Sequence, residues 1–146
     1  MDNHFLLFVH SLLRYGVLLT VAGAGILHLR GYLAKRPILT GERTLAIWAM
    51  ILCHTQIVIG LILYLLNFSA YAQMSGDIGR FWKMEHIGTM ILAAVLVTLG
   101  RVLSKKAKDE LIKQKRVAIF YLIALVLILW AIPWPATTVG HGRGWL

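Results

Sequence analysis

Cysteine and charged residues are both scarce in this chain of 146 residues. Because Cys53 is the single cysteine, no intrachain disulfide can form, and the cysteine spacing of a typical metal site is missing. Charged residues make up 14% of the sequence, well below the share of about 25% in soluble proteins. The sequence also contains no internal repeat and no low-complexity tract. This composition excludes a soluble domain with an ordinary charged surface.

Apolar sequence is what the chain has in abundance. Hydrophobic residues account for 59% of it, and the mean hydropathy is +0.74. A membrane-spanning helix needs about 20 consecutive, mainly apolar residues. Four windows reach this length, at residues 5–29, 44–66, 82–103 and 117–134. We therefore predict an all-α integral membrane protein: a single transmembrane domain over residues 1–146, built as a four-helix up-and-down bundle.

Positive charge is concentrated in two of the three connections between these windows. The basic residues are Arg30, Lys35, Arg36 and Arg43 in the first connection, and Arg101, Lys105, Lys106, Lys108, Lys113, Lys115 and Arg116 in the third. Since Lys and Arg mark the cytoplasmic ends of spans, we expect both connections in the cytoplasm and both termini outside. These basic residues set the orientation of the spans and can contact anionic lipid, which accounts for the net charge of +9. We therefore expect a lipid bilayer and no nucleic acid as partner.

Three histidines, His10, His54 and His86, lie inside three different apolar windows. Imidazole in hydrocarbon is costly unless something holds it, which suggests a metal or haem between the helices. A helix rises 1.5 Å per residue, so His10, His86 and His54 lie about 30, 22 and 16 Å from the cytoplasmic arginine of their spans. Any two histidines that share one iron should therefore include His86.

The partner of His86 depends on how the helices are ordered round the bundle. If successive helices are neighbours round a square, the first and third spans are about 13 Å apart on a diagonal, against about 9 Å between neighbours. A porphyrin between two imidazoles needs the wider gap, which favours His10 with His86. The pair of His54 and His86 is the second choice, and it would need splayed helices.

Further candidate site residues lie close to these histidines in the sequence. Arg14 is one helical turn from His10 on the same face, and a buried guanidinium requires an anion, such as a haem propionate, Glu85 or a lipid phosphate. Glu85 could also orient the imidazole N–H of His86, and Gly88 could leave space for a macrocycle. In the plainer interpretation, these polar residues only hydrogen-bond between packed helices.

Short motifs follow one another along nearly the whole chain. They are His10-Ser11-Leu12-Leu13-Arg14-Tyr15, the stretch HTQIVIGLILY at residues 54–64, the pair Glu85-His86, and Ile132-Pro133-Trp134-Pro135 with Gly144-Trp145. In this order they resemble a group of small bacterial four-span membrane proteins commonly labelled "cytochrome B". The resemblance implies a b-type haem protein of the bacterial inner membrane, with His10, His54 and His86 as candidate ligands. The group has proline where this chain has Ile87, which leaves the direction of His86 open.

Three functional hypotheses follow. The first is a carrier with non-covalent haem b, which passes electrons from quinol to a redox partner near the outer face, with His10 and His86 as axial ligands. Two axial histidines favour electron transfer over oxygen chemistry, so we expect an electron-transfer protein or a subunit of an oxidoreductase, in a homo-oligomer or a larger respiratory complex. The second is a haem-free accessory or assembly protein. The third is a copper or zinc site formed by His10, His54 and His86 together.

Overall fold

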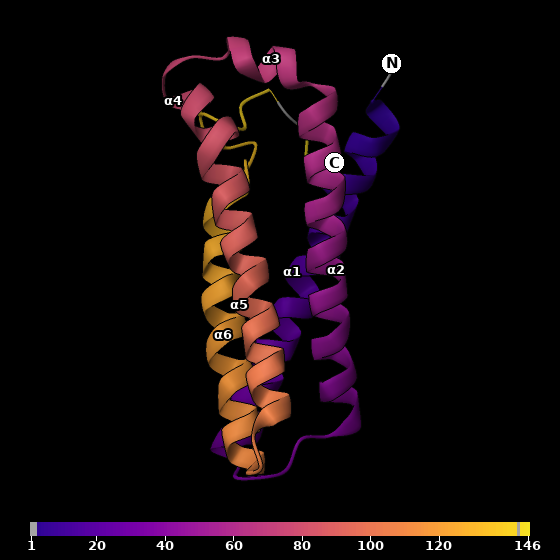
Figure 1. The fold of residues 1–146 in the computed structure, drawn as a ribbon, viewed down its shortest axis with the longest axis vertical. Helices are drawn as coiled ribbons and strands as arrows, with labels where there is room; N and C mark the ends of the chain where they lie inside the picture. The colour runs from indigo at the N-terminus through magenta and orange to yellow at the C-terminus, as the bar shows by residue number, and fades with distance from the viewer. Residues whose placement is uncertain (1–2, 143) are drawn as a thin grey trace.

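The computed structural model describes residues 3–142 and 144–146, and every regular element in that part of the chain is helical. The elements are α1 (His4–Leu33), α2 (Thr40–Leu66), α3 (Phe68–Gln73), α4 (Gly76–Arg80), the π-helical turn η1 (Phe81–Glu85), α5 (His86–Lys106) and α6 (Glu110–Ala131). Figure 1 shows the long helices side by side in an elongated bundle. The predicted all-α architecture is confirmed.

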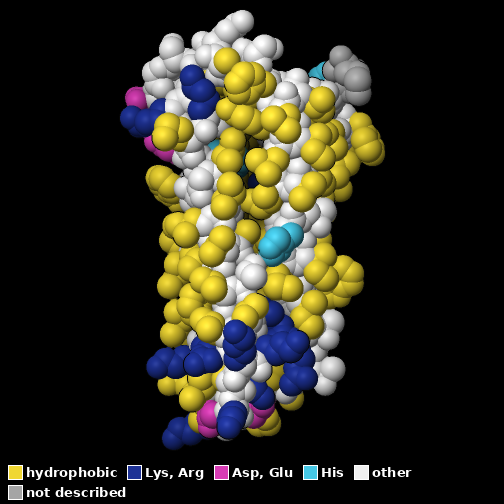
Figure 2. Space-filling view, viewed as in Figure 1, with side chains coloured by type: hydrophobic (Ala, Val, Ile, Leu, Met, Phe, Trp, Pro, Cys, Tyr) yellow, Lys and Arg dark blue, Asp and Glu magenta, His cyan; other side chains and the backbone are white. Residues whose placement is uncertain are grey.

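The surface of the bundle is suited to lipid. Four helical segments are long and apolar enough to cross a membrane: α1, α2, the continuous run Gly76–Lys106, and α6. Large apolar side chains point outward along them, including Leu19, Val126 and Trp130, each about two-thirds exposed or more. Figure 2 shows apolar side chains over most of one face, with a large group of Lys and Arg toward one end and a smaller one at the other. The chain is therefore a multi-pass membrane protein whose apolar surface is consistent with contact to the bilayer.

Successive long helices are neighbours round the bundle. α1 packs on α2 and α6, and α5 packs on the same two helices. The helices α1 and α5 therefore occupy one diagonal, and α2 and α6 the other. This is the helix order for which the sequence predicts His10 and His86 as the two histidines that share one iron. Figure 1 places both ends of the chain in the same half of the bundle, as four spans require.

Small residues allow the helices to approach closely. Ala24, Ala49 and Ala124 are completely buried in the centre. At Gly100 on α5, an added Cβ would lie 2.7 Å from the Cβ atom of Phe120 on α6, so only glycine fits there. In lipid, where hydrophobic burial does not drive helix association, such close contact supplies much of the packing energy.

The last long helix ends earlier than its predicted window, at Ala131 instead of residue 134. The cause is Pro133, which has no N–H to donate to the carbonyl of Leu129 four residues before it. The indole Nε1 of Trp134 donates to that carbonyl instead, at 2.9 Å. Because the prolines have no N–H, carbonyls at this end of the helix lack a backbone donor and accept hydrogen bonds from side chains instead.

The connection between α1 and α2 is fixed by an ion pair. The Nη2 atom of Arg36 lies 2.5 Å from Oε1 of Glu42, whose side chain is 5% exposed. The same carboxylate accepts a hydrogen bond from the backbone N–H of Leu39 at 3.1 Å. The hydrogen bond to Glu42 raises the pKa of Arg36 above the ordinary value for arginine. This end of the bundle therefore has a rigid connection.

Candidate functional site

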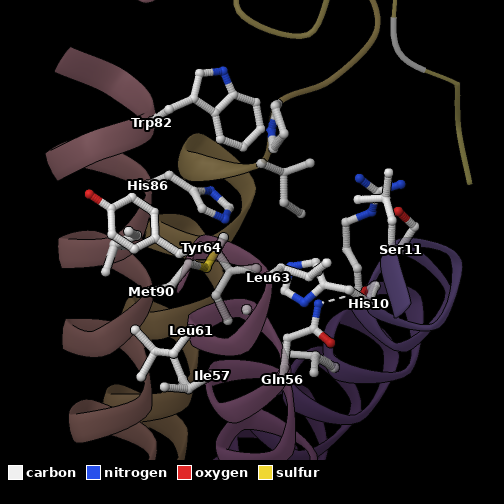
Figure 3. Close-up of a pocket in the computed structure, with 18 of the residues that line it drawn as sticks. His10, Ser11, Gln56, Ile57, Leu61, Leu63, Tyr64, Trp82, His86 and Met90 are labelled. Atoms are coloured by element: carbon white, nitrogen blue, oxygen red, sulfur yellow. Dashed lines mark hydrogen bonds between the residues drawn. The ribbon is translucent and has the colours of Figure 1, made fainter. Parts of the chain in front are cut away.

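A cavity of about 390 Å³ lies inside the half of the bundle that holds the chain ends. Its wall is contributed by α1, α2, α5, α6 and the carboxyl-terminal residues, and most of it is apolar. Ligand sites usually enclose roughly 300–1,000 Å³ and combine an apolar wall with a few convergent polar groups. Figure 3 shows His10 and His86 approaching this space from different helices. The cavity is therefore the candidate site.

His86 is held at the junction of η1 and α5. Its backbone N–H donates to the carbonyl of Phe81, five residues back, which gives the π-helical step. The ring nitrogen Nδ1 donates to the carbonyl of Ala131 on α6 at 2.8 Å. That carbonyl has no helical N–H partner four residues on, because position 135 is proline. The end of α6 thus supplies the backbone carbonyl that accepts the hydrogen bond from His86.

This hydrogen bond fixes the tautomer of His86. A carbonyl oxygen only accepts, so Nδ1 carries the proton and the neutral ring has its lone pair on Nε2. The rings of Phe81 and Trp82 pack against the imidazole, with centroids 5.9 and 5.5 Å away. The side chain is therefore oriented both by a hydrogen bond and by aromatic contact. Metal-binding histidines are commonly oriented in the same manner through their second nitrogen.

His10 reaches the cavity from α1, on the other side of the diagonal. Gly60 on α2 makes room for it, since an added Cβ there would lie 3.0 Å from Cε1 of the imidazole. The side-chain amide of Gln56 donates to the backbone carbonyl of His10 at 2.7 Å. Gly60 and Gln56 of α2 therefore fix the position of His10 on α1.

Buried polar atoms without a hydrogen-bond partner gather at this cavity. Four such atoms occur among the described residues, and three belong to cavity residues: Nδ1 of His10, Nε of Arg14 and Oε1 of Gln56. Buried polar groups in folded proteins are nearly always paired, so three in one cavity require an explanation. A ligand with its own polar groups would provide partners for them.

The carboxyl-terminal tail is tied to α1 at the edge of the cavity. The carbonyl of Trp145 accepts from Nη2 of Arg14 at 2.5 Å and from the hydroxyl of Tyr15 at 2.8 Å. Tail residues, Gly142 and Leu146 among them, line the cavity. Within the described residues, no carboxylate forms an ion pair with Arg14. Its positive charge thus stays available at the rim.

Other predicted site residues lie outside the lining of the cavity. The carboxylate of Glu85 bonds to Nε of Arg80 at 2.6 Å, and it is the carbonyl of Ala131 that accepts from His86. Gly88 is not a wall residue, and an added Cβ there would meet no atom within 4 Å. The surroundings of Glu85 and Gly88 thus give neither of them a contact with the cavity.

His54 also lies apart from the other two histidines. It is exposed on the surface of α2, where Nδ1 contacts the carbonyl of Met50 at 2.8 Å and Nε2 lies 3.4 Å from the hydroxyl of Thr98. In the part of the chain that the structure describes, no three His, Cys, Asp or Glu residues come together as a metal site. The structure therefore brings together His10, His86 and Arg14, and separates His54 from them.

An aromatic stack over the cavity has no simple signal in the sequence. Tyr64 stacks on Tyr71 with ring centroids 5.3 Å apart, and Tyr71 lies 6.1 Å from Trp82. All three line the cavity, yet they come from α2, α3 and η1, so no helical period relates them. By contrast, the acceptor at Ala131 has a readable signal in Pro135, which removes the N–H that would otherwise bond there.

The cavity also reaches the lipid-facing surface between α2 and α5. Leu61 and Ile91 line it, and both side chains are more than 40% exposed. Figure 2 shows a hollow on this face, in the half opposite the large group of Lys and Arg. An apolar molecule dissolved in the bilayer could therefore approach the cavity from the side.

No protein-family model, curated protein or solved structure matches the chain. The function must accordingly be argued from the cavity and its residues.

Proposed function

We propose that the chain is a b-type cytochrome of the bacterial inner membrane, which carries electrons through haem b held non-covalently between His10 and His86. The observation that carries this proposal is the placement of two histidines from diagonally opposite helices, α1 and α5, in the wall of one mainly apolar cavity. Haem held by these two imidazoles would supply a one-electron iron couple.

The residues of the cavity fit such a group. The bond from Nδ1 of His86 to Ala131 leaves the lone pair of the neutral ring on Nε2, which is suited to ligation. His10 contributes the second imidazole, and its buried Nδ1 has no partner among the described residues. Two oriented imidazoles in an apolar wall therefore support ligation by His10 and His86 rather than by exposed His54.

Arg14 is the candidate partner for a propionate. Its guanidinium lines the cavity, carries a charge that no carboxylate of the described chain pairs, and has an unpartnered Nε atom. Arginine binds carboxylates through short, charge-assisted hydrogen bonds. Arg14 would thereby fix the orientation of the group at the rim while the apolar wall excludes water from its centre.

The lateral opening suggests the source of the electrons. Since Leu61 and Ile91 are exposed at the cavity edge, a quinol in the bilayer could approach the site without leaving the lipid. The redox partner would then act near the end that carries the termini, within a homo-oligomer or a larger respiratory complex. Electron transfer, with no bond-making step at the iron, is the activity that fits this arrangement.

The visible spectrum tests the proposal directly. Protein produced in cells supplied with haem precursor should purify with about one haem per chain and a reduced-minus-oxidised spectrum of bis-histidine haem b. His10→Ala and His86→Ala should each lose that spectrum. His54→Ala is the matched control, because it removes an intramembrane histidine that lies outside the cavity, and it should keep full haem content.

Four results would contradict the proposal. A spectrum that survives both cavity variants, or that disappears in the His54 variant, would mean that the ligands are wrongly assigned. A colourless, folded protein with stoichiometric copper or zinc would favour the metal site. A colourless and metal-free protein would favour the accessory role, in which the buried polar residues only join helices or subunits.

A further inference from the structure

A second cavity lies at the other end of the bundle, among the basic residues of the predicted cytoplasmic side. It has a volume of about 200 Å³, and all four long helices contribute to its wall. Among the residues that the structure describes, the charged ones in the wall are Arg43, Arg101, Lys105 and Lys113, and none is a carboxylate. The cavity is therefore a concentrated patch of positive charge enclosed between helices.

The acidic residues nearby are already engaged. Glu42 pairs with Arg36, and Glu110 pairs with Lys113. The side chain of Asp109 accepts from the backbone N–H of Ile112 and caps α6. None of these contacts is an ion pair with Arg43, Arg101 or Lys105, although Glu110 lies near enough to Arg43 to attract it.

Three cations of the wall thus have no ion-pair partner in the described chain: Arg43, Arg101 and Lys105. Like charges gathered in a partly enclosed space repel one another unless an anion lies among them. Arg43 and Lys105 are exposed in part of their side chains, and Arg101 is partly buried. All three line the cavity from α2 and α5, two helices that are packed against each other.

Two buried polar residues complete the wall. His28 and Ser104 are 1% and 2% exposed, and both face this cavity. Nδ1 of His28 bonds to the carbonyl of Ala24 at 2.8 Å, which directs the rest of the ring away from its own helix. A serine hydroxyl and an imidazole beside arginine and lysine form a set of donors typical of phosphate recognition.

From this arrangement we infer a binding site for a phosphate group, held by Arg43, Arg101 and Lys105 with Ser104 and His28 at its base. The phosphate could belong to the headgroup of an anionic phospholipid or to a free phosphate, and the chemistry of recognition is the same for both. Basic pockets between transmembrane helices on the cytoplasmic side commonly bind lipid headgroups. This inference needs no haem and stands apart from the proposed electron transfer.

Binding is measured on the full chain, purified and delipidated in a neutral detergent. One arm titrates inorganic phosphate calorimetrically at constant ionic strength. The other uses native mass spectrometry to compare retention of phosphatidylglycerol with that of phosphatidylcholine. Saturable binding of phosphate alone identifies a soluble ligand, preferential retention of phosphatidylglycerol identifies a lipid headgroup, and either result supports the site.

Charge-matched variants separate the cavity from the general basic surface. Arg43→Gln with Arg101→Gln should weaken binding about tenfold or more, because two charge-assisted contacts are lost. Arg30→Gln with Lys106→Gln removes the same charge from exposed positions outside the cavity and should change affinity less than about twofold. The uncharged change Ser104→Ala should weaken binding about threefold, through one lost hydrogen bond.

The inference would be overturned if the wild-type chain bound neither probe, or if both double variants weakened binding equally. Should the cavity pair fail to fold, Lys105→Gln against Lys106→Gln repeats the comparison at adjacent, exposed residues of one helix. Equal affinity of those two variants would likewise overturn it.

Discussion

The hydroxyl of Tyr121 on α6 donates a hydrogen bond of 2.7 Å to the backbone carbonyl of Ala46 on α2. Tyr121 is completely buried, and its bond joins the two helices across a diagonal of the bundle. The contact therefore fixes the separation of helices that are not successive neighbours.

Tyr121→Phe should lower the free energy of unfolding by about 1 kcal/mol, because the ring still fills its place while one interhelical hydrogen bond is lost. Helicity followed by circular dichroism during titration with sodium dodecyl sulfate measures this change. Tyr32→Phe is the control, since the hydroxyl of Tyr32 makes no hydrogen bond within the described residues. Equal stability of the two variants would mean that the diagonal bond contributes nothing.

Two glycines of α5 should respond in opposite ways to the same substitution. Gly100→Ala places a Cβ atom 2.7 Å from the Cβ atom of Phe120, so α5 and α6 must separate, at a cost of about 1–3 kcal/mol. Gly88→Ala meets no atom within 4 Å and should be neutral or slightly stabilising. The same detergent titration compares them, and a destabilised Gly88 variant would reveal an unrecognised contact at that surface.

Breaking the ion pair of the first connection should cost more from one side than from the other. Arg36→Gln leaves a charged carboxylate at Glu42 with 5% exposure, and it should reduce the free energy of unfolding. Glu42→Gln leaves the guanidinium of Arg36, whose side chain is 32% exposed, accessible to water, so we expect a smaller loss. Unfolding experiments on both variants test the order, and the reverse order would show that Glu42 is more hydrated than its burial implies.

Release of the carboxyl-terminal tail is the fourth prediction. Arg14→Gln combined with Tyr15→Phe weakens the two hydrogen bonds to the carbonyl of Trp145, so a carboxypeptidase should remove residues 144–146 about tenfold faster or more.

The matched control for the tail makes the same two changes at the other end of α1, with Arg30→Gln and Tyr32→Phe. Removal of residues 144–146 by the carboxypeptidase should then stay at the wild-type rate. An equal acceleration in the control would point to a general loosening of α1, and no acceleration in either variant would mean that other contacts hold the tail.

The helices were readable from the sequence because their signal is local. Apolar windows of sufficient length predicted four spans, and the structure contains four suitable segments. The boundaries differ where backbone chemistry intervenes. Pro133 ends α6 before its apolar stretch is complete, and the third segment begins at Gly76 because α4 and η1 continue directly into α5.

The exposure of His54 also had a signal in the sequence. Adjacent helical residues point about 100° apart, so Cys53 and His54 cannot both face the core. The structure buries Cys53, and His54 is exposed on the lipid side. The interpretation with His10, His54 and His86 around one copper or zinc ion needs His54 to face inward, whereas the preferred pair of His10 and His86 does not.

Several parts of the cavity could not be predicted because they depend on contacts between distant segments. The tail meets Arg14 across 131 positions, and Tyr71 joins the stack only because α3 turns the chain back over α2. The sequence records neither side-chain direction nor the path of a connection. The convergence of His10 and His86 was inferable only on the assumption of one particular helix order.

The distance across the cavity between His10 and His86 depends on helices that carry neither histidine. α1 and α5 each pack on α2 and α6, so the gap between His10 and His86 depends on how closely these two intervening helices pack against their neighbours. A substitution in the packed faces of α2 or α6 could therefore change the geometry of the site without altering a residue that lines it.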